Sequence, residues 1–284
     1  MPELPEVEIL VRHLAPLLKG KKVRAVEVRR KKVLGRTREE ELSRTLRGAT
    51  FTDLTRRGKY LLFELRSPVQ KNAVTLVGHL GMTGRMYLLA KNETLPKHAA
   101  VVLKLSEHQM VYEDARYFGR LTLERGGLDK LGPEPLGDEF TAQYFAAALK
   151  RSGQAIKVKL LDQTLVAGVG NIYASEALFR AGISPRRPAN KLSATQTKVL
   201  VEKIREVLKE AIRFGSTVPL DYAGDSKKDR LFYYGGIDDE SDFYQERLLV
   251  YDRRGQKCVR CRTPIKRLVQ AARSTFYCPS CQRA

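Results

Sequence analysis

The first eight residues place an amine nucleophile beside carboxylates, in the order Met1-Pro2-Glu3-Leu4-Pro5-Glu6-Val7-Glu8. Pro2 is small enough that the initiator methionine is normally removed, which leaves a proline with a secondary amine at the start. An α-amino group has a pKa of about 7.7–8, so a useful fraction is unprotonated and nucleophilic at neutral pH. Such an amine next to Glu3 and Glu6 predicts Schiff-base chemistry. The alternative is a helix start in which prolines and acids are simply favoured.

All four cysteines lie in the last 27 residues, as Cys258-x-x-Cys261 and Cys278-x-x-Cys281 with sixteen residues between the pairs. Each pair can place two thiolates on one turn, and two such turns complete a tetrahedron around zinc. Four protein ligands leave no open position, so we expect one structural Zn²⁺. Residues 245–284 also carry ten Lys and Arg residues against two acids, which predicts contact with phosphates.

Two further motifs could bind phosphates. The glycines of Gly168-Val169-Gly170-Asn171 precede an expected helix, whose N–H groups could hold a phosphate. A tight turn between two helices would explain the same glycines. Lys59 follows Arg56-Arg57-Gly58 and could donate to a phosphate or a leaving group, although for this residue taken alone a solvated turn lysine is the favoured interpretation.

Two other turns each combine a large apolar side chain with a nearby cation, in His79-Leu80-Gly81-Met82 and Arg116-Tyr117-Phe118-Gly119. Methionine and phenylalanine at such positions can act as wedges that unstack a base step, while arginine fills the vacated space. Ordinary core packing of Met82 and Phe118, and a structural role for His79, are the competing explanations.

The composition narrows the class of protein. Among 284 residues, 52 Lys and Arg outnumber 32 Asp and Glu, giving a net charge of +20 and a pI near 9.9. Such an excess favours a polyanionic partner, most often nucleic acid. No apolar run reaches the roughly 18–20 residues of a membrane span, and no signal-peptide pattern opens the chain. We therefore expect a soluble, cytoplasmic protein that associates with the nucleoid.

The spacing of apolar residues predicts an α+β protein of several domains. Residues 3–19 have a helical period that ends at Gly20. Short β-like runs then follow with no helix between most of them, so an antiparallel sandwich is favoured over a parallel sheet. These runs cover residues 23–28, 60–65, 73–80, 99–105 and 110–112.

Beyond a Gly- and Pro-rich linker at residues 126–138, the pattern becomes helical. Helices are expected over residues 140–150, 156–161, 171–181 and 194–214, the last with a capping box of Ser193 and Gln196. Residues 216–243 are expected to be a long loop, and 245–284 a small strand-rich unit. The predicted domains are therefore 1–132, 133–243 and 244–284.

Taken together, these motifs resemble the bacterial formamidopyrimidine-DNA glycosylases, within the formamidopyrimidine-DNA glycosylase/endonuclease VIII family. The resemblance runs almost from end to end. Besides the opening eight residues and the cysteine tail it includes 57–62 (Arg-Gly-Lys-Tyr-Leu-Leu), 79–84 (His-Leu-Gly-Met-Thr-Gly), 160–163 (Leu-Leu-Asp-Gln), 168–174 (Gly-Val-Gly-Asn-Ile-Tyr-Ala) and 273–278 (Arg-Ser-Thr-Phe-Tyr-Cys).

The resemblance implies an N-terminal β-sandwich flanked by helices, a helix–two-turn–helix unit and a zinc ribbon. It also implies base-excision repair of oxidised purines such as 8-oxoguanine and formamidopyrimidines in duplex DNA. In that mechanism Pro2 attacks C1′ of a flipped-out nucleotide, Glu3 protonates the ring oxygen, Glu6 helps to hold the N-terminus and Lys59 assists at the lesion. Successive β- and δ-eliminations then cut the strand.

The resemblance also implies which side chains contact damaged double-stranded DNA. Met82, Arg116 and Phe118 occupy the positions that fill the void left by the everted base. The positions that grip the backbone are His79, Lys157, Asn171, Tyr251 and Arg273. Residues 217–243 correspond to the segment that caps the everted base, and a monomer is expected.

One motif departs from the family pattern, because Asp114-Ala115-Arg116-Tyr117-Phe118-Gly119 stands where Asp-Pro-Arg-Arg-Phe-Gly is usual. Three alternative functions are an endonuclease VIII-like preference for oxidised pyrimidines, a catalytically silent DNA-binding protein, and a basic zinc-ribbon protein of RNA assemblies. Leu4, where the endonuclease VIII branch typically has glycine, argues against the first. The complete catalytic set argues against the second, and the Pro2 opening against the third.

Overall fold

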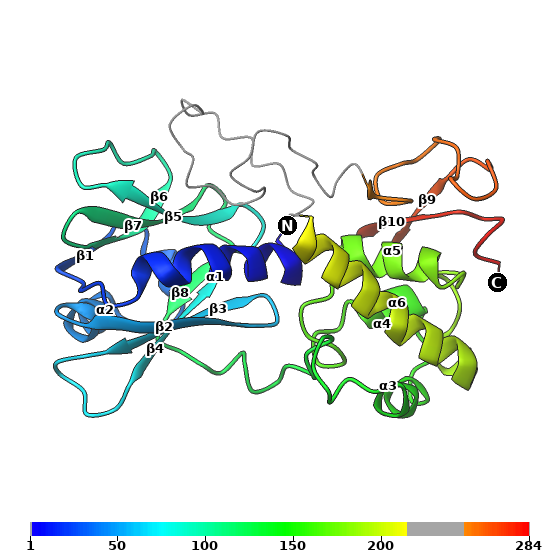
Figure 1. Cartoon of the computed structure of the whole chain (residues 1–284), viewed down its shortest axis with the longest axis horizontal. Helices are drawn as coiled ribbons and strands as arrows, with labels where there is room; N and C mark the ends of the chain where they lie inside the picture. The colour runs from blue at the N-terminus through cyan, green and yellow to red at the C-terminus, as the bar shows by residue number, and fades with distance from the viewer. Residues whose placement is uncertain (1, 215–246, 284) are drawn as a thin grey trace. The chain divides into compact units, whose positions relative to one another are not determined.

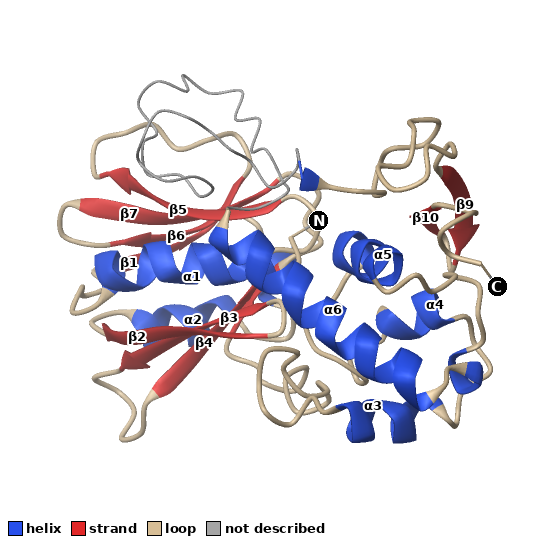
Figure 2. Cartoon of the chain, turned by 45° about the vertical axis from the view of Figure 1, so that its right-hand side comes forward, coloured by secondary structure: helices blue, strands red, loops and turns tan. Residues whose placement is uncertain are grey.

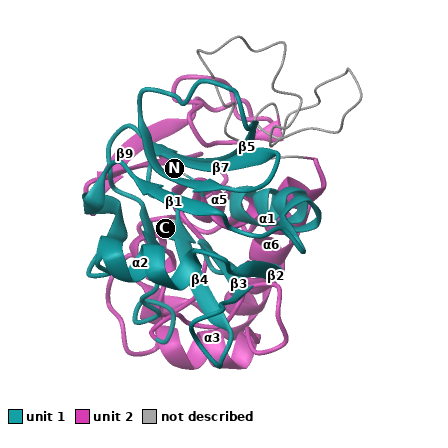
Figure 3. Cartoon of the chain, turned by 90° about the vertical axis from the view of Figure 1, so that its left-hand side faces the viewer, with its two compact units in different colours: residues 1–2, 6–129, 218–239 teal, residues 3–5, 130–217, 240–284 magenta. Residues whose placement is uncertain are grey.

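The computed structural model describes residues 2–214 and 247–283, so the loop expected at 216–243 and the corresponding capping segment lie outside the described residues. The described chain forms two compact units (Figure 3). The first comprises residues 2 and 6–129, and the second comprises 3–5, 130–214 and 247–283. The change from one unit to the other at 129/130 falls inside the Gly- and Pro-rich segment 126–138.

The first helix, α1 (Leu4–Leu18), forms as its period predicts. Its apolar positions Val7, Leu10 and Leu14 are buried, and the chain leaves the helix at Gly20 with a φ of +77°. Glycine adopts this left-handed conformation at little cost, which explains why the helix ends there. In the first unit α1 runs beside two sheets (Figures 1 and 2).

The first unit is the antiparallel sandwich that the short apolar runs predict (Figure 2). One four-stranded sheet has the order β1 (Ala25–Val28), β6 (Ala99–Lys104), β7 (His108–Asp114) and β5 (Gly84–Ala90). The other has the order β2 (Thr50–Arg57), β3 (Tyr60–Arg66), β4 (Val74–His79) and β8 (Arg120–Thr122).

Several elements of this unit were not predicted from the sequence. Strand β2 was missed because a register shift between Phe51 and Asp53 interrupts the alternation of buried and exposed residues. Strand β5 and the short β8 were also missed. The same holds for helix α2 (Glu39–Leu46), which begins with three glutamates and buries only Leu42, Thr45 and Leu46, and for the 3-10 turn at Lys31–Leu34.

The second unit contains the predicted helices α3 (Ala142–Leu149), α4 (Ile156–Leu160), α5 (Asn171–Arg180) and α6 (Ala194–Arg213). The capping box of Ser193 and Gln196 is present, with each side chain accepting from the other residue's backbone N–H. A short 3-10 turn at Ala189–Lys191 precedes it. Helix α5 is the centre of the unit, since all of its side chains from Ile172 to Phe179 are buried.

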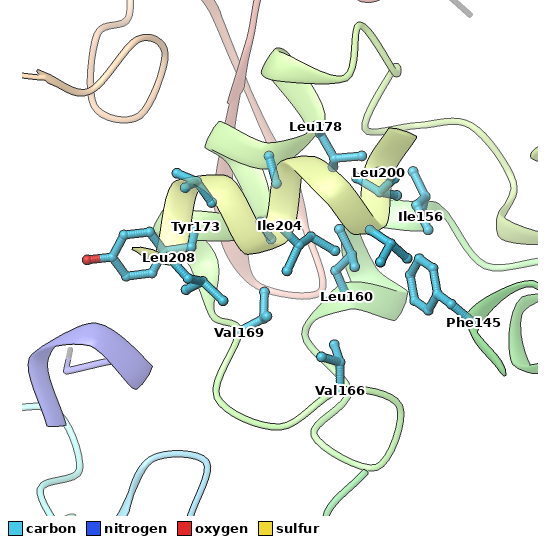
Figure 4. Packing of buried hydrophobic residues seen from close by; sticks show 14 of the residues in the cluster. Phe145, Ile156, Leu160, Val166, Val169, Tyr173, Leu178, Leu200, Ile204 and Leu208 are labelled. Atoms are coloured by element: carbon cyan, nitrogen blue, oxygen red, sulfur yellow. The ribbon is translucent and has the colours of Figure 1, made fainter. Parts of the chain in front are cut away.

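The core around α5 includes side chains of α3, α4 and α6 and of the loop before α5 (Figure 4). Leu200, Ile204 and Leu208 of α6 pack against Tyr173 and Leu178 of α5 in one cluster. Burial of this kind contributes about 1.5–3 kcal/mol for each large apolar side chain. Helix α5 is therefore a rigid frame for the groups at its two ends.

The cysteine segment folds as the hairpin β9 (Lys266–Gln270) and β10 (Arg273–Tyr277) with two cysteine turns, which is the predicted zinc ribbon. It belongs to the same compact unit as the helices, because Val250, Ile265 and Phe276 form an apolar cluster with Phe179 of α5. Within residues 2–214 and 247–283, no helix has the length and apolar character that crossing a membrane requires.

Candidate functional site

The start of the chain is held by the loop before α5. Leu4 donates its backbone N–H to the carbonyl of Gly168 at 3.1 Å. The Glu3 carboxylate is buried and accepts from the backbone N–H groups of Ile172, at 2.9 Å, and Tyr173, at 3.4 Å. These N–H groups have no partner inside a helix and lie at the positive end of its dipole, so they stabilise an anion.

The two glycines of the loop are explained by this contact. A Cβ on Gly170 would overlap the Glu3 carboxylate, and one on Gly168, whose φ is +85°, would lie 2.7 Å from the Leu4 side chain. Gln163 shapes the loop by accepting from the Gly168 N–H at 2.9 Å and donating to the Val169 carbonyl at 2.8 Å. The anion bound at this helix end is thus Glu3 itself, whereas the sequence had suggested a phosphate.

The other residues of the opening motif lie beside Glu3 or in the first turns of α1. Pro2 is partly buried and directly precedes the Glu3 that α5 fixes. Glu6 lies in the first turn of α1 and is fully buried. Glu8, one turn further on, forms an ion pair with Arg56 at 2.8 Å. Glu8 belongs to the opening motif, but no role was predicted for it.

Lys59 lies in the turn between β2 and β3 and is only 8% exposed. A solvated turn lysine is therefore the wrong interpretation. The turn is tight, with Gly58 at a φ of +57°, and Arg56 donates from one guanidinium nitrogen to the Gly58 carbonyl at 3.1 Å. Arg56 thus connects Glu8 of α1 to the residue before Lys59.

His79 ends β4 directly opposite Tyr60, the neighbour of Lys59, and the two rings lie 4.7 Å apart. Burial lowers the pKa of His79 to about 4, and the charges of Lys59 and Arg120 act in the same direction. The Nδ1 atom accepts from the Gly81 N–H at 3.1 Å. The imidazole is therefore neutral at pH 7, with its proton on Nε2, where it can donate to a phosphate.

Met82, Arg116 and Phe118 lie on the two loops that follow β4 and β7. Met82 and Phe118 are 42% and 50% exposed, so core packing does not explain these apolar side chains. The guanidinium of Arg116 lies over the Phe118 ring, 4.8 Å from its centroid. An exposed apolar pair beside a cation has the composition that base-stack wedges use.

A second group of predicted contacts surrounds the N-terminal end of α5 in the second unit. Lys157 is fully buried and donates to the Asn171 Oδ1 at 2.6 Å, while the Asn171 Nδ2 donates to the Ser274 carbonyl at 2.8 Å. Burial raises the pKa of the Tyr251 hydroxyl, although a hydrogen bond with Asn171 and the charge of Arg273 oppose this. The structure thus brings Lys157, Asn171, Tyr251 and Arg273 together.

Tyr251 is positioned by a residue that sequence reasoning missed. Glu176 of α5 is fully buried and accepts from the backbone N–H groups of Leu249, Val250 and Tyr251 at 2.8–3.0 Å. Burial raises the pKa of Glu176, against the lowering effect of these hydrogen bonds and of Arg180. A glutamate on the buried stripe of a helix is the one signal that could have indicated this role.

The four cysteines meet as the spacing predicts. Their Sγ atoms all lie within 4.8 Å of one another, with Cys258 and Cys281 at 3.9 Å and Cys261 and Cys278 at 3.4 Å. Tetrahedral zinc with bonds of about 2.3 Å separates its sulfurs by about 3.8 Å. Backbone N–H groups of Arg260 and Cys281 donate to Cys258 and Cys278, which suits thiolates. The donor set therefore fits one structural Zn²⁺.

Comparison with known proteins gives three family matches along the chain. Residues 1–121 match the formamidopyrimidine-DNA glycosylase N-terminal domain, and residues 131–220 match the H2TH domain of the same enzymes. Residues 255–284 match a zinc finger found in FPG and IleRS.

Full-length relatives agree with these matches. The chain is 40% identical to formamidopyrimidine-DNA glycosylase of Bacillus licheniformis over 100% of both chains. It is 33% identical to a Lactococcus lactis FPG mutant bound to Fapy-dG-containing DNA, with a TM-score of 0.88 over 100% of both chains. The wild-type L. lactis protein bound to DNA with an oxidised pyrimidine gives a TM-score of 0.86 at 33% identity, again over 100% of both.

Proposed function

The chain belongs to the formamidopyrimidine-DNA glycosylase family, whose members are bifunctional DNA glycosylases and abasic-site lyases, and we propose that it excises oxidised purines through the amine of Pro2. The observation that carries this assignment is the Glu3 carboxylate held on the N-terminal N–H groups of α5, directly after Pro2. Substrates of this class include formamidopyrimidines, as in the DNA bound to the L. lactis relative, and 8-oxoguanine.

The proposed reaction starts when the unprotonated Pro2 nitrogen attacks C1′ and the bond to the damaged base breaks. The base leaves with the electron pair of that bond and takes up a proton from water. Flipping the nucleotide out of the stack gives the nitrogen access to C1′. The ionised Glu3 then takes the proton from the new ammonium and delivers it to the ring oxygen as the C1′–O4′ bond opens. The result is an iminium between Pro2 and the open sugar.

The iminium makes the protons at C2′ acidic, so base-assisted β-elimination expels the 3′ phosphate. A following δ-elimination expels the 5′ phosphate. In this proposal Glu6, which is buried in the first turn of α1, helps to hold the N-terminus, and Lys59 assists at the lesion and its phosphate. Both carry out their roles from positions with little exposure to water, where charges act strongly.

DNA recognition is divided between two groups of residues in this proposal. Met82, Arg116 and Phe118 fill the space left by the everted nucleotide, with Arg116 facing the orphaned base. His79, Lys157, Asn171, Tyr251 and Arg273 contact the backbone around the lesion. The hydrogen bond that Lys157 donates to Asn171, and the neutral His79, support this group as pre-arranged phosphate ligands.

The proposal extends to the organisation and location of the protein. The functional regions are 1–132 for catalysis, 133–243 for helix–two-turn–helix binding with a capping segment at 217–243, and 244–284 for the zinc ribbon. The relatives are bacterial, and we infer a monomer acting on nucleoid DNA in the cytoplasm. The net charge of +20 supports this partner.

The test is borohydride trapping on duplex DNA that carries 8-oxoguanine opposite cytosine, with mass analysis of the N-terminus. A covalent adduct at Pro2 is expected from protein that starts at Pro2. The matched controls are a Pro2→Gly variant and a version with an uncleaved N-terminal extension, which converts the amine to an amide and should give no adduct. An adduct from the extended version, or none from protein starting at Pro2 even on an abasic site, would overturn the mechanism.

A second candidate is a preference for oxidised pyrimidines, which the complex of the L. lactis relative with such DNA favours. Trapping rates on matched duplexes with 8-oxoguanine or an oxidised pyrimidine separate the two. Faster trapping on the purine lesion is expected, and faster trapping on the pyrimidine would reassign the substrate class without changing the chemistry.

A further inference from the structure

Asp114 is a fully buried carboxylate in the first unit to which the reaction above assigns no role. It ends β7, immediately before the loop that carries Arg116 and Phe118. Its Oδ1 accepts from the Arg116 N–H at 3.1 Å, and its Oδ2 accepts from the Gly119 N–H at 2.8 Å. The carboxylate therefore fixes both ends of this loop.

The Asp114 carboxylate also binds the loop after β4, which carries Met82. The Thr83 hydroxyl donates to the Asp114 Oδ1 at 2.7 Å, and Thr83 follows Met82 directly. The oxygens of this side chain thus accept hydrogen bonds from donors on both loops, which joins the two loops through one residue. Removing one partner would leave a buried polar group without its hydrogen bond.

The two loops are in close contact beside Asp114. A Cβ on Gly81, whose φ is +62°, would lie 2.5 Å from the Gly119 nitrogen, and one on Gly119 would overlap the Tyr112 hydroxyl. Tyr112 is buried and its hydroxyl contacts both the Asp114 Oδ2, at 3.4 Å, and the His79 carbonyl, at 3.5 Å. The two loops are therefore packed against each other at Gly81, Gly119 and Tyr112.

We propose that Asp114 is a positioning residue that couples the Met82 loop to the Arg116–Phe118 loop, so that the three side chains enter the duplex as one unit. The inference rests on the proposed function, which assigns these side chains to the void. It predicts that loss of the carboxylate or of its Thr83 partner impairs duplex-dependent steps and leaves chemistry on an exposed abasic site intact.

The experiment compares T83V, T83S and D114N in single-turnover excision of 8-oxoguanine placed opposite cytosine or adenine. A second substrate, a preformed abasic site in a single strand, has no opposite base and no void to fill. Valine matches threonine in shape but lacks the hydroxyl, whereas serine keeps it. E113Q, at the neighbouring residue whose carboxylate binds Tyr87 at 2.7 Å, is the matched control for D114N.

We expect T83V and D114N to slow duplex excision at least about tenfold and to reduce the preference for cytosine, because small misplacements near a reacting group are costly. Single-strand cleavage should stay within about twofold, as should every activity of T83S and E113Q. In the double variant T83V/F118A the loss of the duplex excision rate should be smaller than the product of the two single losses, because both changes affect the same pair of coupled loops.

Two results would overturn the proposal. One is that T83V and D114N leave duplex excision and base preference unchanged, while M82A and F118A impair them. The other is an equal loss on the duplex and the single strand, which indicates general disruption. If M82A and F118A themselves have no effect on the duplex, the void-filling assignment fails, and the coupling fails with it.

Discussion

The Glu8 carboxylate accepts from the Arg56 Nε at 2.8 Å, and through this pair helix α1 is fixed to the turn that carries Lys59. Arg56 also donates to the carbonyl of Gly58, the residue before Lys59. Burial alone would raise the pKa of Glu8, but the hydrogen bonds and charges of Arg56 and Arg12 lower it below its ordinary value. Helix α1 and the turn that carries Lys59 are thus connected within the first unit.

Replacing Arg56 should therefore destabilise the protein more than replacing Arg12. The Arg56 side chain is 10% exposed and that of Arg12 is 65% exposed, although both contact Glu8 at 2.8 Å. We expect R56A to lower the free energy of unfolding by about 1–3 kcal/mol and R12A by less than about 0.5 kcal/mol. Urea denaturation measures both, and equal losses would contradict the connection.

The difference in stability between the wild-type protein and R56A should also depend on pH. A carboxyl with a lowered folded pKa stabilises the protein above its ordinary value of 4.5 and loses this contribution as pH falls through the folded pKa. The wild-type protein should therefore lose more stability than R56A when the pH drops below about 4.5. Strand cleavage should slow in R56A, since the turn of Lys59 loses its support.

Gly170→Ala should abolish most of the activity through Glu3 alone. Gly170 has φ −130° and ψ −155°, an extended conformation that alanine adopts without strain, so the added methyl acts only by overlapping the Glu3 carboxylate. We expect borohydride trapping to slow by about a hundredfold, as misplaced catalytic groups commonly cause. G153A is the control, because a Cβ there meets nothing within 4 Å. Normal trapping by G170A would show that Glu3 does not need this position.

His79 should make stability depend on pH between about 6.5 and 4. Its folded pKa is about 4 and its ordinary value is 6.5, so the unfolded chain binds the extra proton in this window. Stability is fully present above 6.5 and falls as the pH is lowered towards 4, by up to about 3 kcal/mol. Unfolding followed at several pH values should show this slope in the wild-type protein.

H79N and H79Q separate the two ring nitrogens of this histidine. The asparagine Oδ1 can replace Nδ1 as acceptor for the Gly81 N–H, and the glutamine Nε2 can replace the Nε2 donor. In both variants the free energy of unfolding should no longer depend on pH between about 6.5 and 4. Only H79N, which lacks a donor in place of Nε2, should bind DNA more weakly. A slope that persists in both variants would assign it to another group.

The fold could be predicted from the sequence wherever periodicity was regular. Helix α6 has four-residue spacing and a capping box, and α1 has a glycine at its end, so both were found. Strand β2 was not, because a bulge removes its alternation, and α2 was not, because its exposed face is almost entirely charged. The local spacing of apolar residues therefore did not reveal elements whose conformation depends on packing against their neighbours.

The metal centre was predicted because the type and spacing of its four cysteines identify it, whereas the catalytic roles of Pro2 and Lys59 stay predictions. Residues that hold others in place were missed, because their partners are distant in sequence: Glu176 contacts residues 73–75 positions away, and Asp114 reaches back 31 positions to Thr83. One local feature could have indicated the role of Asp114. Its side chain accepts from the N–H of Arg116, two residues later, which is typical of an Asx turn.

Removal of zinc should unfold the hairpin and weaken DNA binding together. Cys258 and Cys278 belong to the apolar cluster that joins the hairpin to Phe179, and the carbonyl of Ser274 on β10 accepts from Asn171. We expect chelation to release one Zn²⁺ per chain and to lower the affinity for abasic-site duplex by at least about tenfold. Metal analysis and salt-titrated binding measure this, and added Zn²⁺ should restore it. Full affinity without metal would exclude this coupling.

Ala272→Gly should stabilise the protein, contrary to the usual effect of glycine. The turn between β9 and β10 places Ala271 at φ +48° and Ala272 at φ +58°, a conformation that costs an L-residue about 1–2 kcal/mol. Glycine removes this strain and adds entropy to the unfolded chain, so the net gain should be about 0.5–1 kcal/mol. A147G, an exposed position inside α3, makes the same chemical change in a helix and should destabilise by about 1 kcal/mol. Opposite signs in thermal unfolding are the expected result. If A272G also destabilises the protein, the turn between β9 and β10 is not strained.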